Sequence, residues 1–173
     1  MPSRSIPSSP SIFSVMSQLA NEYGAINLAQ GFPNFPIDQA LRNAVSEAAQ
    51  GEVHQYAPYQ GQLTLRKAIK DLIEQNNGFP ITTDEILITA GATQAIFTTV
   101  QALVSTGDEV VLLDPCYDCY ETPVLLVGGT PVHVELGPDF LPDWKAITSA
   151  VNSKTRLLII NSPHNPSGRV WSP

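Results

Sequence analysis

The chain has 173 residues, of which 43% are hydrophobic and 14% charged, and its formal net charge is −7. This length favours one domain or part of a larger one, and the low charged fraction argues against disorder. Sixteen acidic residues against nine basic ones argue against nucleic acid or an anionic membrane surface as a partner. A small anionic ligand remains open, because backbone amides bind such ligands without net positive charge.

The N-terminal segment is rich in serine and proline and lacks the uninterrupted apolar core of a signal peptide. No apolar run reaches the ~20 residues that are needed to span a bilayer. We therefore expect a cytoplasmic protein that does not act at a membrane. Its only cysteines, Cys116 and Cys119, are too few for a disulfide framework.

Apolar residues recur at helical spacing in three places in the first half of the chain. They predict helices over about 12–24, 41–51 and 65–78, each with a glycine at its end. Residues 1–10, rich in serine and proline, are expected to form an arm or a loop before the first of these helices.

From residue 85 onward the pattern changes to short, almost continuously apolar runs that alternate with helical segments. Such an alternation is typical of an α/β fold with a parallel sheet that helices cover on both faces. The helix that normally covers the last strand is absent after residue 161, so we expect the fold to be incomplete in this chain. The predicted strands are 85–90, 109–114, 131–136 and 155–161, and the predicted helices are 96–103, 118–127 and 144–151.

The turn after the first predicted strand carries Gly91, Ala92 and Thr93. In open α/β sheets, ligands bind outside the carboxyl ends of the strands. A Gly-Ala-Thr turn that opens a helix there presents backbone N–H groups and a hydroxyl to an anion, which predicts a phosphate cradle. The turn matches neither a Walker A loop nor a GxGxxG fingerprint. The alternative is that Gly91 only makes the turn.

The loop after the second predicted strand contains Cys116, Tyr117 and Cys119. Tyr117 could present its ring to a flat cofactor or pack in the core. The CxxC spacing raises a redox function, but Asp114 and Asp118 disfavour the thiolate that a redox pair needs. We expect no metal site, because the three histidines, His54, His133 and His164, are scattered along the chain.

The loop after the last predicted strand, NSPHNPSG at 161–168, contains two prolines and a glycine that make a rigid turn. An asparagine amide held in such a turn can donate to an oxygen of a ligand. The alternative is that Asn161 and Asn165 bind only the backbone of their own loop.

These stretches together resemble the class I/II aminotransferases, which are pyridoxal-phosphate (PLP) enzymes of fold type I. The segments INLAQGFPNFP, QYAPYQGQLTLRKAI, ITAGATQAIF, GDEVVLLDPCYDCYE and NSPHNPSG occur in the order of that family. AQGFPNFP and DPCYDCYE are similar to the methionine and kynurenine aminotransferases. The resemblance implies that residues 1–45 form the N-terminal arm and a segment of the small domain. Residues 46–173 would form the first part of the large PLP-binding domain.

The resemblance also implies a role for each matching residue. Gly91, Ala92 and Thr93 would bind the cofactor phosphate, Tyr117 would stack on the pyridine ring, and Asn165 would bind the 3′ oxygen of the ring. Gly31 would contact the substrate carboxylate through its backbone amide. Tyr56 would reach the cofactor phosphate of a second subunit, which implies a homodimer with shared active sites.

No residue of this chain matches the catalytic lysine that forms the Schiff base with the cofactor. We expect that lysine beyond Pro173, so the 173-residue chain alone is predicted to be inactive. The four lysines present, Lys67, Lys70, Lys145 and Lys154, are interpreted as surface residues.

The resemblance implies transfer of an amino group from an L-amino acid, of methionine, kynurenine, glutamine or aromatic type, to a 2-oxo acid. Two other functions remain open. A PLP-dependent β-lyase acting on cysteine conjugates or cystathionine would share the NSPHNPSGRVW segment. A non-catalytic fragment or binding module would retain the fold without a covalently bound cofactor.

Overall fold

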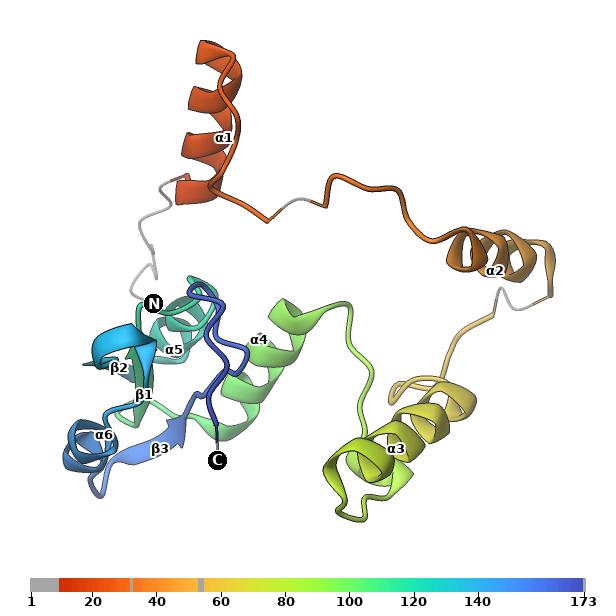
Figure 1. Cartoon of the computed structure of the whole chain (residues 1–173). Coiled ribbons are helices and arrows are strands. Elements are labelled where there is room, and N and C mark those ends of the chain that lie inside the picture. The colour runs from red at the N-terminus through yellow and green to blue at the C-terminus, as the bar shows by residue number, and fades with distance from the viewer. Residues whose placement is uncertain (1–9, 32, 53–54, 173) are drawn as a thin grey trace, which may run out of the picture. The chain divides into compact units, whose positions relative to one another are not determined.

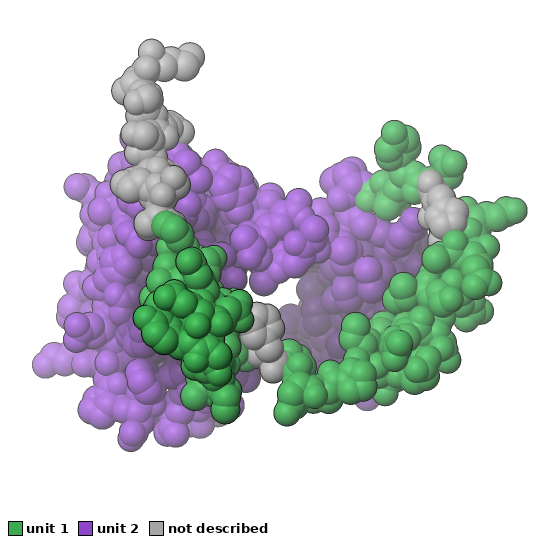
Figure 2. Space-filling model, turned by 90° about the horizontal axis from the view of Figure 1, so that it is seen from above, with its two compact units in different colours: residues 1–58 green, residues 59–173 purple. Residues whose placement is uncertain are grey.

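The computed structural model describes residues 10–31, 33–52 and 55–172. The chain divides into two compact units, residues 1–58 and 59–173, which Figure 2 shows in different colours. None of the helices in these described ranges combines the length and the apolar character that a bilayer-spanning segment needs.

The first unit contains two helices that begin and end on local signals. Helix α1 (Ile12–Tyr23) begins where the Ser11 hydroxyl accepts from the Ser14 N–H at 3.2 Å and ends at Gly24, which has φ 60°. Helix α2 (Gln39–Gln50) begins where the Asp38 carboxylate accepts from the Ala40 N–H at 2.7 Å. Both helices confirm the predictions from the hydrophobic spacing.

The second unit contains helices and strands in alternation, which confirms the predicted parallel α/β class (Figure 1). Its elements are α3 (Leu63–Asn77), η1 (Thr83–Glu85), α4 (Ala92–Leu103), β1 (Glu109–Asp114), α5 (Glu121–Val127), β2 (Thr130–Glu135), η2 (Pro138–Phe140), α6 (Trp144–Ala150) and β3 (Thr155–Leu158).

Strand β1 is the centre of a three-stranded parallel sheet with the order β2-β1-β3. Alternate side chains of a strand point to opposite faces. Val110 and Leu112 therefore pack with residues of α4 and α5, including Val100 and Val124, in one buried cluster. On the other face, Val111 and Leu113 pack with Val134 of β2 and Ile147 of α6 in a second cluster. Burial on both faces explains why the four central residues of β1, 110–113, are all apolar.

The predicted strand at 85–90 is wrong. Residues 83–85 form the 3₁₀ turn η1, and 86–90 have no strand assigned. A β-strand requires a hydrogen-bonded neighbour, and in the described part of the chain no strand pairs with this segment. Its Ile88 N–H instead donates to the carbonyl of Gln60 at 2.9 Å.

Two other predicted elements are shorter in the structure. The helix expected from 118 begins at Glu121, because residues 118–120 form a turn in which the Tyr120 N–H donates to the Tyr117 carbonyl at 3.1 Å. The strand expected to reach 161 ends at Leu158, although the Ile159 N–H still donates to the Val111 carbonyl at 3.0 Å. Both differences lengthen the loops at the carboxyl ends of the strands.

Gly61 and Arg66 connect α3 to the segment that precedes α4. Gly61 has φ +97°, and a Cβ at this position would lie 2.3 Å from Cγ1 of Ile88. The buried Arg66 guanidinium donates to the carbonyls of Gly61 at 3.2 Å and Thr83 at 2.8 Å. Because of its positive φ and the short distance to Ile88, position 61 requires a residue without a side chain.

Candidate active site

The predicted cradle lies at the N-terminus of α4. Gly91 precedes the helix with φ +87°, and a Cβ at this position would have no atom within 4 Å. The Thr89 hydroxyl donates to the Gly91 carbonyl at 3.1 Å, and the Gln94 side chain accepts from the Ala90 N–H. These bonds hold the turn in front of an open space.

The first N–H groups of α4 are free to bind an anion. In the described part of the chain, the N–H groups of Ala92 and Thr93 have no hydrogen-bond acceptor, and no side chain caps the helix. Unpaired N–H groups at the positive end of a helix dipole favour a negatively charged ligand. The 12-residue α4 is long enough to contribute such a dipole. This arrangement favours an anion cradle over a glycine that only makes the turn.

The loop between β1 and α5 lies next to this cradle. The Thr93 hydroxyl is 3.7 Å from the Cys119 sulfur, and both side chains lie near enough to the Tyr117 phenol to shift its pKa, which Cys119 raises and Thr93 lowers. The Tyr117 ring also contacts Tyr120 edge to face, with the ring centroids 5.8 Å apart. The structure therefore brings Thr93 and Tyr117 together, although they are far apart in sequence.

Asn165 lies in the loop after β3, whose strand neighbours β1 in the sheet. The Asn165 N–H donates to Oδ1 of Asn161 at 2.8 Å. Asn161 therefore binds the backbone of its own loop, as the alternative interpretation of this segment predicted. Within the described ranges, the Asn165 side chain makes no hydrogen bond with Thr93 or Tyr117.

The buried His164 holds the same loop in place. Its Nδ1 is 2.6 Å from the Ser167 hydroxyl, and its ring stacks on Trp171 with the centroids 5.6 Å apart. Trp171 in turn donates through Nε1 to the carbonyl of Phe140 at 2.9 Å. The loop that carries Asn165 is therefore anchored to η2 as well as to β3.

Gly31 and Tyr56 belong to the first unit, and both are exposed. The predicted roles of both residues stay predictions. Of the three histidines considered as ligands, His54 lies outside the described residues.

The lysines agree with their interpretation as surface residues. Lys67, Lys145 and Lys154 are exposed. Lys70 is half-buried, and its ammonium donates to the Glu74 carboxylate at 2.6 Å. The hydrogen bond with Glu74 raises the pKa of Lys70.

Cys116 and Cys119 have different surroundings, and both are free thiols. Burial, followed by the hydrogen bond with Asp114, raises the pKa of Cys116 to about 12. Asp118 acts in the same direction, as the sequence predicted. A dithiol redox pair needs a readily formed thiolate, so the surroundings of Cys116 disfavour that function.

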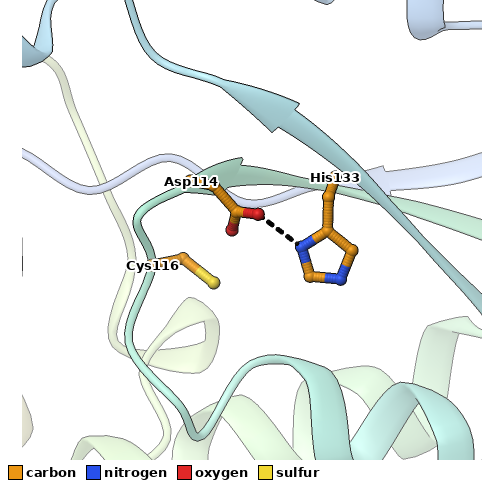
Figure 3. Close-up of side chains that lie close together, drawn as sticks. All are labelled: Asp114, Cys116 and His133. Carbon is orange, nitrogen blue, oxygen red and sulfur yellow. Dashed lines mark hydrogen bonds and ion pairs between the residues drawn. The ribbon is translucent and has the colours of Figure 1, made fainter.

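One contact in this region was not predicted from the sequence. His133 of β2 places its Nδ1 2.9 Å from Oδ2 of Asp114, the last residue of β1 (Figure 3). The two residues are 19 positions apart and meet only because β1 and β2 pair in parallel. A prediction of the strand order and register would have been needed to find this pair.

Comparison with known proteins identifies the family. The family model described as "Aminotransferase class I and II" matches residues 23–173. Methionine aminotransferase of Escherichia coli (strain K12) is 41% identical, over 92% of this chain and 42% of that protein. Human kynurenine–oxoglutarate transaminase 3 is 37% identical, over 90% of this chain and 37% of that protein.

A solved structure agrees with these sequence relatives. N-succinyldiaminopimelate aminotransferase from Mycobacterium tuberculosis superposes with a TM-score of 0.89 at 42% identity, over 96% of this chain and 44% of that one. The chain spans less than half the length of the curated relatives it matches. With the parallel sheet and the cradle at α4, these matches show that the chain belongs to the class I and II aminotransferases and has their fold type I architecture.

Proposed function

We propose that this chain forms the phosphate-binding part of a PLP-dependent aminotransferase, which moves an amino group from an L-amino acid to a 2-oxo acid. The observation that carries the proposal is the open cradle at the N-terminus of α4, with unpaired N–H groups of Ala92 and Thr93 next to Tyr117. The named relatives support the same activity.

The residues of the cradle fit the cofactor. A phosphate dianion matches the unpaired N–H groups and the Thr93 hydroxyl, and the aromatic Tyr117 matches a flat ring. When bound, PLP acts as the electron sink for the reaction at the amino acid. Thr93 and the backbone of 91–93 would hold and orient the phosphate, and Asn165 would hold the ring oxygen. Gly31 would bind the substrate carboxylate.

The proton shuttle of this reaction requires a lysine near the cofactor. Because the described lysines are exposed or paired with a carboxylate, we propose that this lysine lies outside residues 1–173. The boundary between the small and large domains near 45–46 is part of the same proposal. A cytoplasmic location stays a prediction from the sequence.

The amino donor that we propose is an L-amino acid of methionine, kynurenine, glutamine or aromatic type. The names of relatives include methionine and kynurenine, which supports these two. The proposed homodimer rests on Tyr56, whose side chain is fully exposed in the first unit. Light scattering after size exclusion tests the dimer, and a monomer would contradict it.

The function is tested by an assay of the protein as the cell makes it. Methionine, kynurenine and glutamine are each offered with a 2-oxo acid, and we expect the new amino acid to form only when both substrates are present. A β-lyase would instead release pyruvate and ammonia without the oxo acid. A binding module would give neither product and no absorbance from a bound cofactor.

A further inference from the structure

Three side chains with metal-binding atoms meet at the carboxyl end of β1, outside the proposed cradle. They are Asp114, Cys116 and His133, and their ligand atoms lie within 4.8 Å of one another. Figure 3 shows that the three side chains point toward a common space from β1, from the loop after it and from β2. Nothing in the proposed transamination uses this cluster.

The register of the sheet explains why the three residues meet. His133 lies opposite Leu112 in the parallel pairing of β1 and β2. Because alternate residues of a strand share a face, Asp114 is on the same face as Leu112 and diagonal to His133. Cys116 follows two residues later, in the loop that runs toward α5. Two of the three donors therefore come from paired strands, which fixes their separation.

The distances are close to those of a tetrahedral site. With metal–ligand distances of about 2.0–2.3 Å, the ligand atoms of a zinc ion lie about 3.3–3.7 Å apart. The pair of Asp114 Oδ2 and His133 Nδ1, at 2.9 Å, has to open by about half an ångström. The remaining pairs, all within 4.8 Å, have to close by at most about 1.5 Å. Side-chain rotations achieve shifts of this size.

A fourth residue supports the histidine from the other side. Nε2 of His133 is 4.0 Å from Oε1 of Glu121, the first residue of α5. Histidines that bind a metal through one nitrogen usually donate the other N–H to a carboxylate or carbonyl. Nδ1 of His133 is directed at Asp114, and Glu121 has to approach Nε2 by about an ångström to accept a hydrogen bond from it.

We propose that Asp114, Cys116 and His133 form a binding site for one thiophilic divalent cation, of which Zn²⁺ fits best, with Glu121 orienting His133. One oxygen, one sulfur and one nitrogen donor favour Zn²⁺ over the oxygen-binding Mg²⁺ and Ca²⁺. The cation takes the place of the thiol proton of Cys116, which leaves to solvent. It also takes the place of the proton between Asp114 and His133, and His133 then carries its one ring proton on Nε2, facing Glu121. Water completes the tetrahedron.

Cobalt binding to the full chain tests this site, because the absorption spectrum of bound Co²⁺ depends on its ligands and on its coordination geometry. We expect one Co²⁺ per chain, with the visible bands of a tetrahedral ion and a near-ultraviolet charge-transfer band from a thiolate. Zn²⁺ should displace it stoichiometrically. Cys116→Ser should abolish the charge-transfer band, whereas the matched control Cys119→Ser should retain it. A band that survives in Cys116→Ser, or no band in the unaltered protein, would overturn the proposal.

A second variant tests the role of Glu121 without removing a ligand. Glu121→Gln should weaken Zn²⁺ binding about 10–100-fold, measured by competition with a chromogenic chelator, and should keep the charge-transfer band. The control Glu47→Gln makes the same charge change on α2, outside the cluster, and should leave the affinity unchanged. Equal affinities for Glu121→Gln and the unaltered protein would contradict the proposed orientation of His133.

Discussion

Helices α1 and α2 of the first unit have no buried residue in the described part of the chain, whereas strand β1 of the second unit has four in succession. In α1, Leu19 is 40% exposed; in β1, Leu112 is fully buried. Helices of 12 residues are marginal in water unless they pack. The difference indicates that local capping defines the first unit and that burial of β1 stabilises the second.

The largest effect is expected from shortening a side chain in β1. Leu112→Ala removes a fully buried side chain from the cluster that α4 and α5 complete, and it should lower the free energy of unfolding by about 2–5 kcal/mol. Leu19→Ala in α1 is the matched control and should cost much less. Urea unfolding measures both. Equal losses would remove the distinction between the two units.

A smaller loss is expected where the backbone of the second unit packs closely. Gly61→Ala combines a left-handed φ with a Cβ 2.3 Å from the Ile88 side chain, and it should destabilise the unit by about 2–3 kcal/mol. Gly78→Ala shares the positive φ but has no atom within 4 Å of the new Cβ, and it should cost about 1 kcal/mol. If the two variants lose the same free energy of unfolding, the contact with Ile88 does not contribute to the cost of Gly61→Ala.

Removing a helix cap in the first unit should act only locally. Ser11→Ala and Asp38→Ala each delete a side-chain acceptor for a helix N-terminus, and each should cost its own helix about 1 kcal/mol. Far-ultraviolet circular dichroism should show reduced helix content, while the main urea transition of the second unit stays in place. A shifted main transition would mean that the two units unfold together.

The smallest effect concerns reactivity rather than stability. Because the pKa of Cys116 is about 12, its thiolate is scarce at pH 8, and alkylation should be on the order of tenfold or more slower than in denaturant. The rate should rise as the pH approaches 12. The folded state holds this proton more tightly, so stability should fall as the pH rises above 9.

The variant Cys119→Ser leaves a single thiol for this measurement, and mass spectrometry follows its alkylation. In the folded protein, the alkylation rate of Cys116 should reach the rate measured in denaturant only if the loop after β1 opens. Equal rates in buffer and denaturant would therefore show that this end of the second unit is not buried.

Local signals made much of the fold predictable from the sequence. The glycines at 24 and 78 end α1 and α3, and the continuous apolar run at 110–113 forms the buried centre of strand β1. The segment 85–90 has the same apolar character, yet it forms no strand because strand formation also depends on a neighbour. The composition of a segment predicts its burial, but it does not predict whether another strand pairs with it.

The candidate site shows the same limit. Thr93 and Tyr117 were predicted to share a ligand. The structure brings them together because the N-terminus of α4, which carries Thr93, lies next to the loop after β1, which carries Tyr117. The pair of Asp114 and His133 was missed, because it depends on the register between β1 and β2. Gly31 and Tyr56 stay predictions from the resemblance alone.

The central claim is that the N-terminus of α4 binds the phosphate of the cofactor. The most direct test is the binding of pyridoxamine 5′-phosphate to the chain, measured by calorimetry against pyridoxamine, which lacks the phosphate. Neither compound has an aldehyde to react with the surface lysines. We predict at least about tenfold tighter binding of the phosphate form, since a hydrogen bond to a charged group contributes about 1.5–3 kcal/mol.

Thr93→Ala removes the hydroxyl but keeps the backbone N–H groups of the cradle, so it should reduce that preference in part, whereas Thr98→Ala, an exposed control on the same helix, should keep it in full. Equal affinities of the unaltered protein for the two compounds would contradict the assignment of α4 as the cofactor cradle, and a preference that Thr93→Ala leaves intact would contradict the role of its hydroxyl.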